Sequence, residues 1–243
     1  MGKIRITGAN HGFIGSHVMK YLVGLGYDVD HFSTADFIAQ KWGILDDAET
    51  VVHCAWPTDK DLHSVEHLEF AEWTCNFFNE CKKRGIRVIN IGSSSEYGVK
   101  YEAMKEDMIC EPINPYGIAK LSVTLYAKLL GYNTLRIFSP YGEGGKNFVS
   151  QYEKVEKYGN PLDNRDYFPV ALVCQAVERL LHTKHLYGEI INVCSGLSIT
   201  NGRVAGEWDT ALISDKWYKY PQRQNEPQYW FGDIAKMKKL LNL

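Results

Sequence analysis

Three glycines near the start of the chain are spaced so that a strand can turn directly into a helix. The stretch RITGANHGFIGSHVMKYLVGLGYDV, which begins at Arg5, places Gly8, Gly12 and Gly15 between an apolar strand and an amphipathic helix. Such a turn directs backbone N–H groups and the positive end of the helix dipole at one point, where a phosphate can bind. The spacing therefore predicts that the turn holds the pyrophosphate of a dinucleotide.

Each position of this turn has an expected part in holding the dinucleotide. Gly8 allows the sharp turn, Gly12 lets the pyrophosphate approach the backbone, and Gly15 lets the helix pack closely on the strand. The residues of the turn that we expect to contact the cofactor are Gly8, Asn10, Gly12, Phe13, Ile14 and Gly15.

Strands rich in valine and isoleucine alternate with helical stretches along most of the chain. The strand-like runs are KIRIT, DVDHF, ETVVHCAW, IRVINIGS, YNTLRIFS and GEIINVCS. Helical spacing follows Gly12, covers about 66–83, begins again near Tyr116 and follows Pro169. This order predicts an α/β fold with a doubly wound, Rossmann-type parallel sheet, whose ligands bind beyond the carboxyl ends of the strands.

The length and composition suit one domain with a small covering lobe. The 243 residues are 45% apolar, which is enough for one sizeable core, so we expect a single domain over 1–243. Segments of about 142–168 and 198–243 are predicted to form the substrate lobe. The second segment contains Trp208, Trp217 and Trp230, which could stack on a base or sugar or simply pack the lobe.

Charge and cysteine usage exclude several classes of partner. The 27 basic and 29 acidic residues are mixed and give a net charge of −2, so we expect no nucleic-acid partner. No apolar run is long enough to span a membrane, and the chain opens directly on a strand without a leader. The six cysteines form no C-x-x-C pair, which predicts free thiols and a cytoplasmic protein. His63 and His67 are interpreted as surface histidines, and no metal site is expected.

A tyrosine followed four residues later by a lysine can transfer a proton at a sugar or alcohol oxygen. On a helix the two side chains share one face, so the ammonium can lower the pKa of the phenol. The pattern occurs at Tyr101–Lys105 and at Tyr116–Lys120. Only the second pair follows a proline and begins a sustained helical run, so Tyr116 and Lys120 are the predicted catalytic pair.

These motifs resemble the extended short-chain dehydrogenase/reductase family, also called the NAD-dependent epimerase/dehydratase family, which acts on nucleotide sugars. TGANHGFIG is similar to the family opening T-G-A-x-G-F-I-G, with one extra residue, Asn10 or His11, where we expect the turn to bulge. RVINIGSSSEYG is similar to S-S-x-x-x-Y-G, in which the catalytic serine stands four residues before the tyrosine. The resemblance implies Ser93, with Ser94 as the alternative, as the group that polarises the substrate carbonyl.

Further matches extend the resemblance over nearly the whole chain. ETVVHCAW is similar to D-x-V-x-H-x-A-A, which implies that Cys54 and Ala55 lie beside the cofactor. TLRIFSPYGEGG is similar to L-R-x-x-N-V-Y-G-P-G and implies that Phe138 lies beside the nicotinamide. PQRQNEPQYWFGDIAKMKKLL is similar to the family's closing motif, in which Arg223 would hold a nucleotide diphosphate; the alternative is an ordinary surface arginine. The resemblance also implies that Lys120 binds the ribose next to the nicotinamide.

Departures from the family pattern bear on the reaction and the cofactor. Dehydratases of the family carry an acid pair where this chain has Ser94 and Ser95. We therefore expect that these serines contact the substrate and that the chain does not catalyse dehydration. Glu96 could replace the acid pair only with a shift of register. The position of the ribose-binding acid falls on Ser33 or Thr34, which slightly favours NADP over NAD. The stretch before VVHCAW is short, which predicts that one strand–helix unit is missing near the adenine side.

The expected function is NAD(P)-dependent reduction of a nucleotide-diphosphate keto-sugar, at C4, in making a deoxysugar. Tyr116 would donate the proton, with Ser93 and Lys120 assisting. One alternative is a nucleotide-sugar epimerase with bound NAD, and another is a dinucleotide-binding regulator without catalysis. By resemblance, we expect a homodimer formed through the long helices that begin near Glu66 and Tyr116.

Overall fold

A computed structural model describes residues 2–57, 60–145, 148–151, 163–204 and 230–243 of the chain. Its centre is a six-stranded sheet in the order β2-β1-β3-β4-β5-β9, and every neighbouring pair of strands is parallel. This is the doubly wound α/β fold that the alternation of strands and helices predicts. The strands of this sheet are β1 (Lys3–Thr7), β2 (Val29–Phe32), β3 (Ala48–His53), β4 (Arg87–Ser93), β5 (Asn133–Ile137) and β9 (Ile190–Val193).

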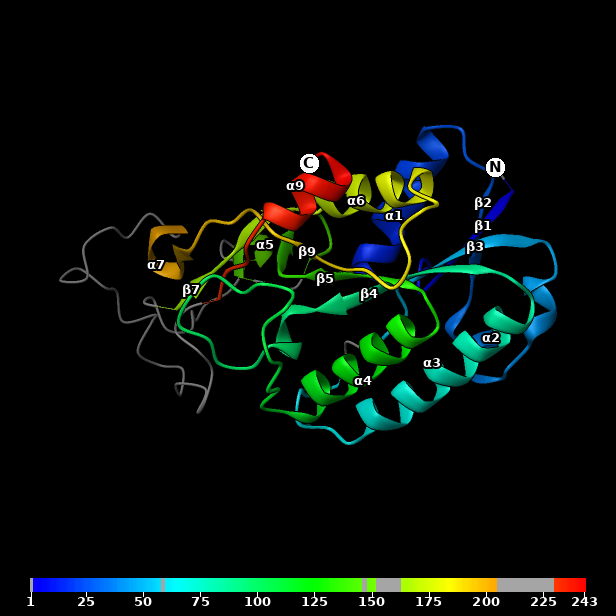
Figure 1. Cartoon of the computed structure of the whole chain (residues 1–243), viewed down its shortest axis with the longest axis horizontal. Helices are drawn as coiled ribbons and strands as arrows, with labels where there is room; N and C mark the ends of the chain where they lie inside the picture. Colours follow the sequence, from blue (N-terminus) through cyan, green and yellow to red (C-terminus); the bar gives the residue numbers. More distant parts are fainter. Residues whose placement is uncertain (1, 58–59, 146–147, 152–162, 205–229) are drawn as a thin grey trace.

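Helices cover both faces of the sheet. In Figure 1, α1, α6 and α9 lie above the sheet, and α3 and α4 lie below it. The long helices are α1 (Phe13–Gly24), α3 (Glu66–Lys83), α4 (Pro115–Leu129), α6 (Ala171–His182) and α9 (Ala235–Leu241). The shorter helical segments are α2 (Thr34–Ile38), η1 (Trp42–Leu45), η2 (Ser94–Glu96), α5 (Phe148–Gln151) and α7 (Asn201–Val204).

Local sequence signals set both ends of α4, the helix that carries the predicted catalytic pair. Asn114 caps its first turn by accepting a hydrogen bond from the backbone N–H of Gly117 at 2.8 Å. Pro115 occupies the first helical position, where its missing N–H costs nothing. Gly131 follows the last turn with φ of +83°, a conformation that glycine adopts without strain. The helix therefore begins at a defined residue next to the end of β4.

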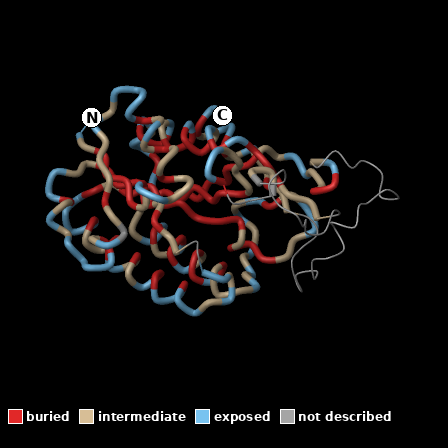
Figure 2. Tube along the Cα trace, turned by 180° about the vertical axis from the view of Figure 1, so that it is seen from behind, coloured by how far each residue is buried: buried red, intermediate tan, exposed pale blue. Residues whose placement is uncertain are grey.

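Each face of the sheet has its own apolar cluster, and the buried residues follow the central strands (Figure 2). The face under α3 and α4 is rich in phenylalanine. Phe37 stacks on Phe70 at 5.3 Å between ring centroids and meets Phe77 edge to face at 5.2 Å. This packing holds α2 against α3.

The sheet ends at β2, as the short connection before VVHCAW predicts. Strand β2 pairs only with β1 among the described strands, and α2 and η1 alone connect it to β3. The expected loss of one strand–helix unit on this side is therefore confirmed.

The two segments predicted to form the substrate lobe meet through a short ladder. Strand β7 (Asn164–Arg165) pairs antiparallel with β10 (Ile199–Thr200), and β6 (Ser139–Tyr141) pairs parallel with β8 (Tyr167–Pro169). The end of the second segment behaves differently, because α9 packs on α6 and β9 and buries Met237 and Leu241 in the main core. The last helix therefore belongs to the packing of the sheet.

Two predictions drawn from composition can be compared with the structure. No helix of the described residues is long and apolar enough to cross a membrane. All six cysteines are free thiols, as predicted.

Candidate active site

The glycine turn connects β1 to α1 and leaves the first N–H groups of that helix open. Gly8 has φ of +71°, and a Cβ there would lie 2.8 Å from the Cα of Ala55 at the end of β3. A Cβ at Gly12 would overlap the carbonyl oxygen of Gly8, and one at Gly15 would lie 2.7 Å from the same atom. No side chain caps α1, and its first turn contains no acidic residue. The backbone donors therefore point to a site that an anion can fill.

A cavity of about 840 Å³ opens over this turn. Its volume is within the range of cofactor sites, and its walls combine apolar side chains with backbone from the ends of β1 and β3. The fit to a dinucleotide is good because the phosphate-binding turn lies in the cavity wall. The lining residues are Gly8, Asn10, His11, Gly12, Phe13, Ile14, Phe32, Ser33, Ala35, Ile38, Cys54, Ala55, Trp56, Pro57, Lys60, Glu66, Glu69, Phe70, Trp73 and Gly144.

The expected cofactor residues divide in a simple way. All the expected residues of the turn except Gly15 line the large cavity. So do Ser33, which follows β2, and Cys54 and Ala55, which follow β3. Gly15 lies against the backbone of Gly8 and Ala9, which is the packing role predicted for it. His11 also lines the cavity, in the stretch where the extra residue was expected to make the turn bulge.

A smaller cavity of about 340 Å³ lies beyond the end of β4 and adjoins the first. The two share Pro57 and Lys60 in their walls. The predicted Ser93, Ser94, Ser95 and Tyr116 line the smaller cavity. So does Phe138, which was expected beside the nicotinamide. The lining residues are Pro57, Lys60, Leu62, His67, Ser93, Ser94, Ser95, Tyr116, Phe138, Ser139, Arg165 and Trp230.

Ser93 and Tyr116 line this cavity together. Ser93 is the last residue of β4, and its Oγ accepts the backbone N–H of Ser95 at 3.2 Å. Burial raises the pKa of Tyr116 above its ordinary value, and a hydrogen bond with the Ser93 side chain acts in the opposite direction. The serine thus stabilises the phenolate form of the tyrosine, as proton transfer requires.

Lys120 is buried and lines neither cavity. Its Nζ donates to the carbonyl oxygen of Ile91 at 2.9 Å and lies 3.9 Å from the centroid of the Trp56 ring. Burial lowers the pKa of Lys120 to about 8. Lys120 is absent from the groups that shift the pKa of Tyr116, so in this structure the ammonium does not lower that pKa as expected. The physical reason is that burial brings the pKa of Lys120 below that of Tyr116, so the lysine is already neutral at the pH where the tyrosine ionises.

Trp56 is a residue that the sequence motifs did not single out. Its Nε1 donates to Nδ1 of His67 at 3.2 Å, and Nε2 of His67 lies 3.0 Å from the carbonyl oxygen of Asp61. These partners assign the His67 proton to Nε2, because Nδ1 must accept. His67 is 1% exposed, so the interpretation as a surface histidine is wrong. The visible signal was the tryptophan in HCAW, where the family pattern has alanine.

Trp230 and Arg165 add a second wall to the small cavity. The indole N–H of Trp230 donates to Ser94 Oγ at 2.6 Å, and the guanidinium of Arg165 lies 5.8 Å from the Trp230 ring centroid. Trp230 was expected either to stack on a base or sugar or to pack the lobe, whereas Arg165 was not among the predicted site residues, although it stands in the family-like stretch NRDYFPV. Arg223, expected to hold the diphosphate, lies outside the described residues, as do Trp208 and Trp217.

Ser33 has a partner that changes the environment at the end of β2. Its hydroxyl donates to the carboxylate of Asp36 at 2.6 Å and accepts the backbone N–H of Asp36 at 3.0 Å, so it caps α2. Hydrogen bonds from Ser33 and from Lys41 lower the pKa of Asp36, which keeps it anionic. A negative charge therefore stands directly behind the serine that lines the large cavity.

The second Tyr-x-x-x-Lys pattern is remote from this arrangement. Tyr101 is 86% exposed in a loop, and neither it nor Lys105 lines either cavity. Among the described residues, no cluster of histidine, cysteine or acidic side chains could hold a metal ion.

The model of the NAD dependent epimerase/dehydratase family matches residues 4–194, which is most of the chain. The chain belongs to this family. One relative in the NAD-dependent epimerase/dehydratase family is the uncharacterized UDP-glucose epimerase YtcB of Bacillus subtilis, 25% identical over 74% of this chain and 60% of its own length. Another is the dTDP-6-deoxy-L-talose 4-dehydrogenase (NAD(+)) of Aggregatibacter actinomycetemcomitans, 30% identical over 48% of this chain and 51% of its own length. The chain thus spans between half and three fifths of these two relatives.

Solved structures of the same fold carry NAD. MoeE5 in complex with UDP-glucose and NAD superimposes with a TM-score of 0.83 at 22% identity, over 100% of this chain and 93% of that one. NAD also stands in a complex of MoeE5 with UDP-glucuronic acid and in a UDP-glucuronic acid 4-epimerase. The expected preference for NADP finds no support among these neighbours. The expected preference for NADP rested on the Ser33 hydroxyl, which already donates a hydrogen bond to the carboxylate of Asp36.

Proposed function

We propose that the chain is an NAD-dependent oxidoreductase that interconverts a hydroxyl and a keto group, at C4, on a nucleotide-diphosphate sugar. The favoured direction is reduction of the keto-sugar. When bound in its reduced form, NADH, the cofactor would supply the hydride for this reduction. The Tyr116 phenol then gives its proton to the sugar oxygen, and the Ser93 hydroxyl donates a hydrogen bond to the same oxygen. The relative that is named as a 4-dehydrogenase of a dTDP-6-deoxy sugar supports this reaction type.

The observation that carries the proposal is that Ser93 and Tyr116 line one cavity, which adjoins the cavity over the glycine turn. A sugar oxygen placed there can accept a hydrogen bond from the serine hydroxyl and the proton of the phenol. A regulator that only senses a dinucleotide has no use for such a pair. We therefore favour an enzyme over the non-catalytic alternative.

The small cavity also argues against removal of water from the sugar. Dehydration needs an acid and a base beside the carbons that lose water, and none of the described lining residues is an aspartate or a glutamate. Ser94 and Ser95 stand there, and Glu96 is fully buried outside the cavity. Both ring nitrogens of His67 have partners, so it does not substitute for the missing pair.

Epimerisation is the second candidate, because one relative is named as a UDP-glucose epimerase. The same Ser93 and Tyr116 would serve it, since the tyrosine would take the proton from one face of the sugar and return it after the sugar turns over. The two reactions differ in cofactor demand. An epimerase regenerates NAD in each cycle and runs without added cofactor, whereas a reductase consumes NADH in stoichiometric amounts.

We propose NAD as the cofactor because of the carboxylate behind Ser33. A ribose 2′-hydroxyl near Ser33 could donate to that carboxylate, whereas a 2′-phosphate there would meet a like charge that Lys41, at 3.2 Å, only partly offsets. The diphosphate of the sugar substrate has two candidate partners. Arg165 and Lys60 stand in the small cavity, and a guanidinium pairs well with phosphate oxygens.

A homodimer through α3 and α4 is also proposed. The two helices pack on each other and expose apolar side chains, of which Leu125 is 54% and Leu129 78% exposed. A surface of this kind on neighbouring helices favours self-association. Light scattering at several concentrations should give the mass of a dimer for the wild type and of a monomer for Leu125→Lys. A monomeric wild type would contradict this part of the proposal.

The decisive experiment is a screen of nucleotide-diphosphate sugars with product analysis. UDP- and dTDP-linked 4-keto-sugars would be offered with NADH, and the corresponding UDP-hexoses would be offered without cofactor. Oxidation of NADH with a reduced sugar product supports the reductase, and a change of sugar configuration without added cofactor supports the epimerase. If the protein binds NAD but turns over neither class of sugar, the non-catalytic regulator is the remaining function.

A further inference from the structure

Glu96 is a buried carboxylate that lies beside the catalytic serine and outside both cavities. It is 0% exposed and comes directly after the three serines at the end of β4. Gly92 makes room for it, since a Cβ at Gly92 would lie 2.6 Å from Oε1 of Glu96. A buried charge is costly unless every lone pair has a donor, so its partners show what it does.

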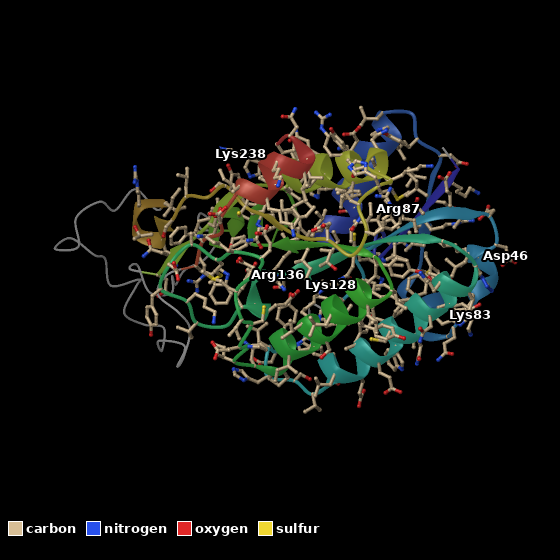
Figure 3. All side chains as sticks on the ribbon, in the orientation of Figure 1. Asp46, Lys83, Arg87, Lys128, Arg136 and Lys238 are labelled. Carbon is tan, nitrogen blue, oxygen red and sulfur yellow. The ribbon has the colours of Figure 1, made fainter. Side chains whose placement is uncertain are left out.

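The carboxylate connects three elements of the fold. Oε1 accepts the backbone N–H of Ser93 at 2.8 Å and the hydroxyl of Thr124, on α4, at 3.0 Å. Oε2 accepts from Nε of Arg136, on β5, at 2.9 Å, and Nη2 of Arg136 lies at the same distance. Arg136 is 1% exposed and lies inside the molecule, whereas Lys83 lies at its edge (Figure 3). Glu96 thus ties the end of β4 to the helix that carries Tyr116.

This arrangement fixes the direction of the Ser93 hydroxyl. Glu96 holds the backbone N–H of Ser93, while Ser93 Oγ accepts the N–H of Ser95, so the two residues form a closed capping box. With its oxygen used as an acceptor on the backbone side, the hydroxyl keeps its hydrogen for Tyr116 or the substrate. The aim of the serine therefore depends on a residue that never touches the substrate.

The charge of Glu96 also reaches the other two members of the catalytic set. It opposes the lowering of the Lys120 pKa by burial, and it adds to the raising of the Tyr116 pKa. The other titratable groups around Lys120 are Cys54, which burial keeps as a neutral thiol, His53, whose pKa burial lowers to about 3, and His67, whose pKa burial also lowers. Glu96 is thus the negative charge that acts on both residues.

We propose that Glu96, paired with Arg136, is a positioning residue of the active site that aims the Ser93 hydroxyl at Tyr116 and supplies the counter-charge for the buried Lys120 ammonium. The proposal rests on the proposed function, because it assigns Ser93 and Tyr116 to proton transfer. A buried ion pair is weak evidence for stability, since apolar residues of similar volume often serve as well or better. The contacts with Ser93 and Thr124 are what give this pair its role in the site.

Two substitutions separate the hydrogen bond that Glu96 accepts from the Ser93 N–H, called the anchor below, from the negative charge of Glu96. Glu96→Gln keeps an oxygen for the Ser93 N–H but removes the charge. Glu96→Asp keeps the charge but withdraws it by one methylene. Glu106→Gln is the matched control, because Glu106 also accepts a backbone N–H, that of Asn192 at 2.8 Å, and lines neither cavity.

The first readout needs no substrate. The phenolate absorbance of Tyr116 is titrated as the difference between each protein and its Tyr116→Phe counterpart. Loss of the nearby negative charge in Glu96→Gln should lower the pKa of Tyr116 by about one unit, whereas Glu96→Asp and Glu106→Gln should leave it near the wild-type value. An unchanged pKa in Glu96→Gln would overturn the claim that the charge of Glu96 acts on the catalytic residues, whatever the sugar screen finds.

A second readout follows the anchor once the screen has given a substrate. Glu96→Asp should lower kcat about tenfold with KM within twofold, because the serine loses its aim while the walls of the cavity remain. An unchanged kcat in Glu96→Asp would overturn the anchor. If Glu96→Gln does not fold, the double variant Glu96→Gln/Arg136→Gln removes the unpaired guanidinium. Arg136 does not shift the pKa of Tyr116, so the titration must move the same way.

Discussion

The two adjoining cavities differ in what builds their walls. The large cavity begins at a turn of consecutive residues whose backbone is the binding surface, and apolar side chains complete it. The small cavity is formed by hydroxyls and rings from the ends of β4 and β5, the start of α4 and the segment after 229, and by cations from β7 and from the loop between β3 and α3. Backbone donors hold a ligand whatever the neighbouring side chains are, whereas proton transfer needs particular side chains in contact. The first cavity is suited to binding, and the second to reaction.

The largest effect that separates the two cavities should come from Tyr116→Phe. Removal of the phenol hydroxyl deletes the proton donor, so turnover should fall by roughly 10²- to 10⁴-fold. NAD affinity, measured by calorimetry, should stay within twofold, because Tyr116 does not line the large cavity. A variant with wild-type turnover would show that the small cavity is not the reaction site.

Gly12→Ala should affect the large cavity alone. The added methyl would overlap the carbonyl oxygen of Gly8, so the turn must shift, at a cost of about 1–3 kcal/mol in the free energy of unfolding. We expect the dissociation constant of NAD to rise about tenfold or more, because the displaced N–H groups no longer converge on the pyrophosphate. Thermal unfolding and NAD titration measure the two effects.

Gly24→Ala is the matched control on the same helix. Nothing lies within 4 Å of a Cβ built at Gly24, at the last turn of α1. Alanine should therefore raise the melting temperature slightly, because it loses less backbone entropy than glycine, and NAD affinity should not change. Equal loss of NAD binding in both variants would show that the turn geometry is not what holds the cofactor.

Asp36→Asn tests the far end of the large cavity. Without the carboxylate behind Ser33, the affinity for NADP should rise about tenfold, while the affinity for NAD should change little. The ratio of the two dissociation constants is the measurement. Asp46→Asn is the control, because Asp46 is an exposed acid whose side chain lines neither cavity (Figure 3). Preference for NADP in the wild type would refute the role of Asp36.

The same contrast explains which features could be predicted from sequence. The glycine turn, the helix over 66–83 and the start of α4 depend on neighbours in the chain, and periodicity and capping reveal them. Ser93 and Tyr116 could be singled out from sequence because each stands at the end of a recognisable element, and both line the small cavity. The contact of Trp56 with Lys120 and the hydrogen bond of Trp230 to Ser94 join residues 64 and 136 positions apart. No local pattern encodes such pairs, so only the fold brings them into view.

The smallest effect should come from Trp230→Phe, which tests the wall of the small cavity and spares its chemistry. Phenylalanine keeps a ring beside Arg165 but loses the indole N–H that donates to Ser94 at 2.6 Å. A neutral hydrogen bond contributes about 1 kcal/mol, which corresponds to roughly a fivefold change in KM. The value of kcat should remain near that of the wild type, because Ser93 and Tyr116 keep their contact. Steady-state kinetics on the substrate found by the sugar screen measure both constants. A fall in kcat with KM unchanged would mean that Trp230 acts on the reacting atoms themselves. The interpretation of Trp230 as part of the cavity wall, separate from the residues that transfer the proton, would then be wrong.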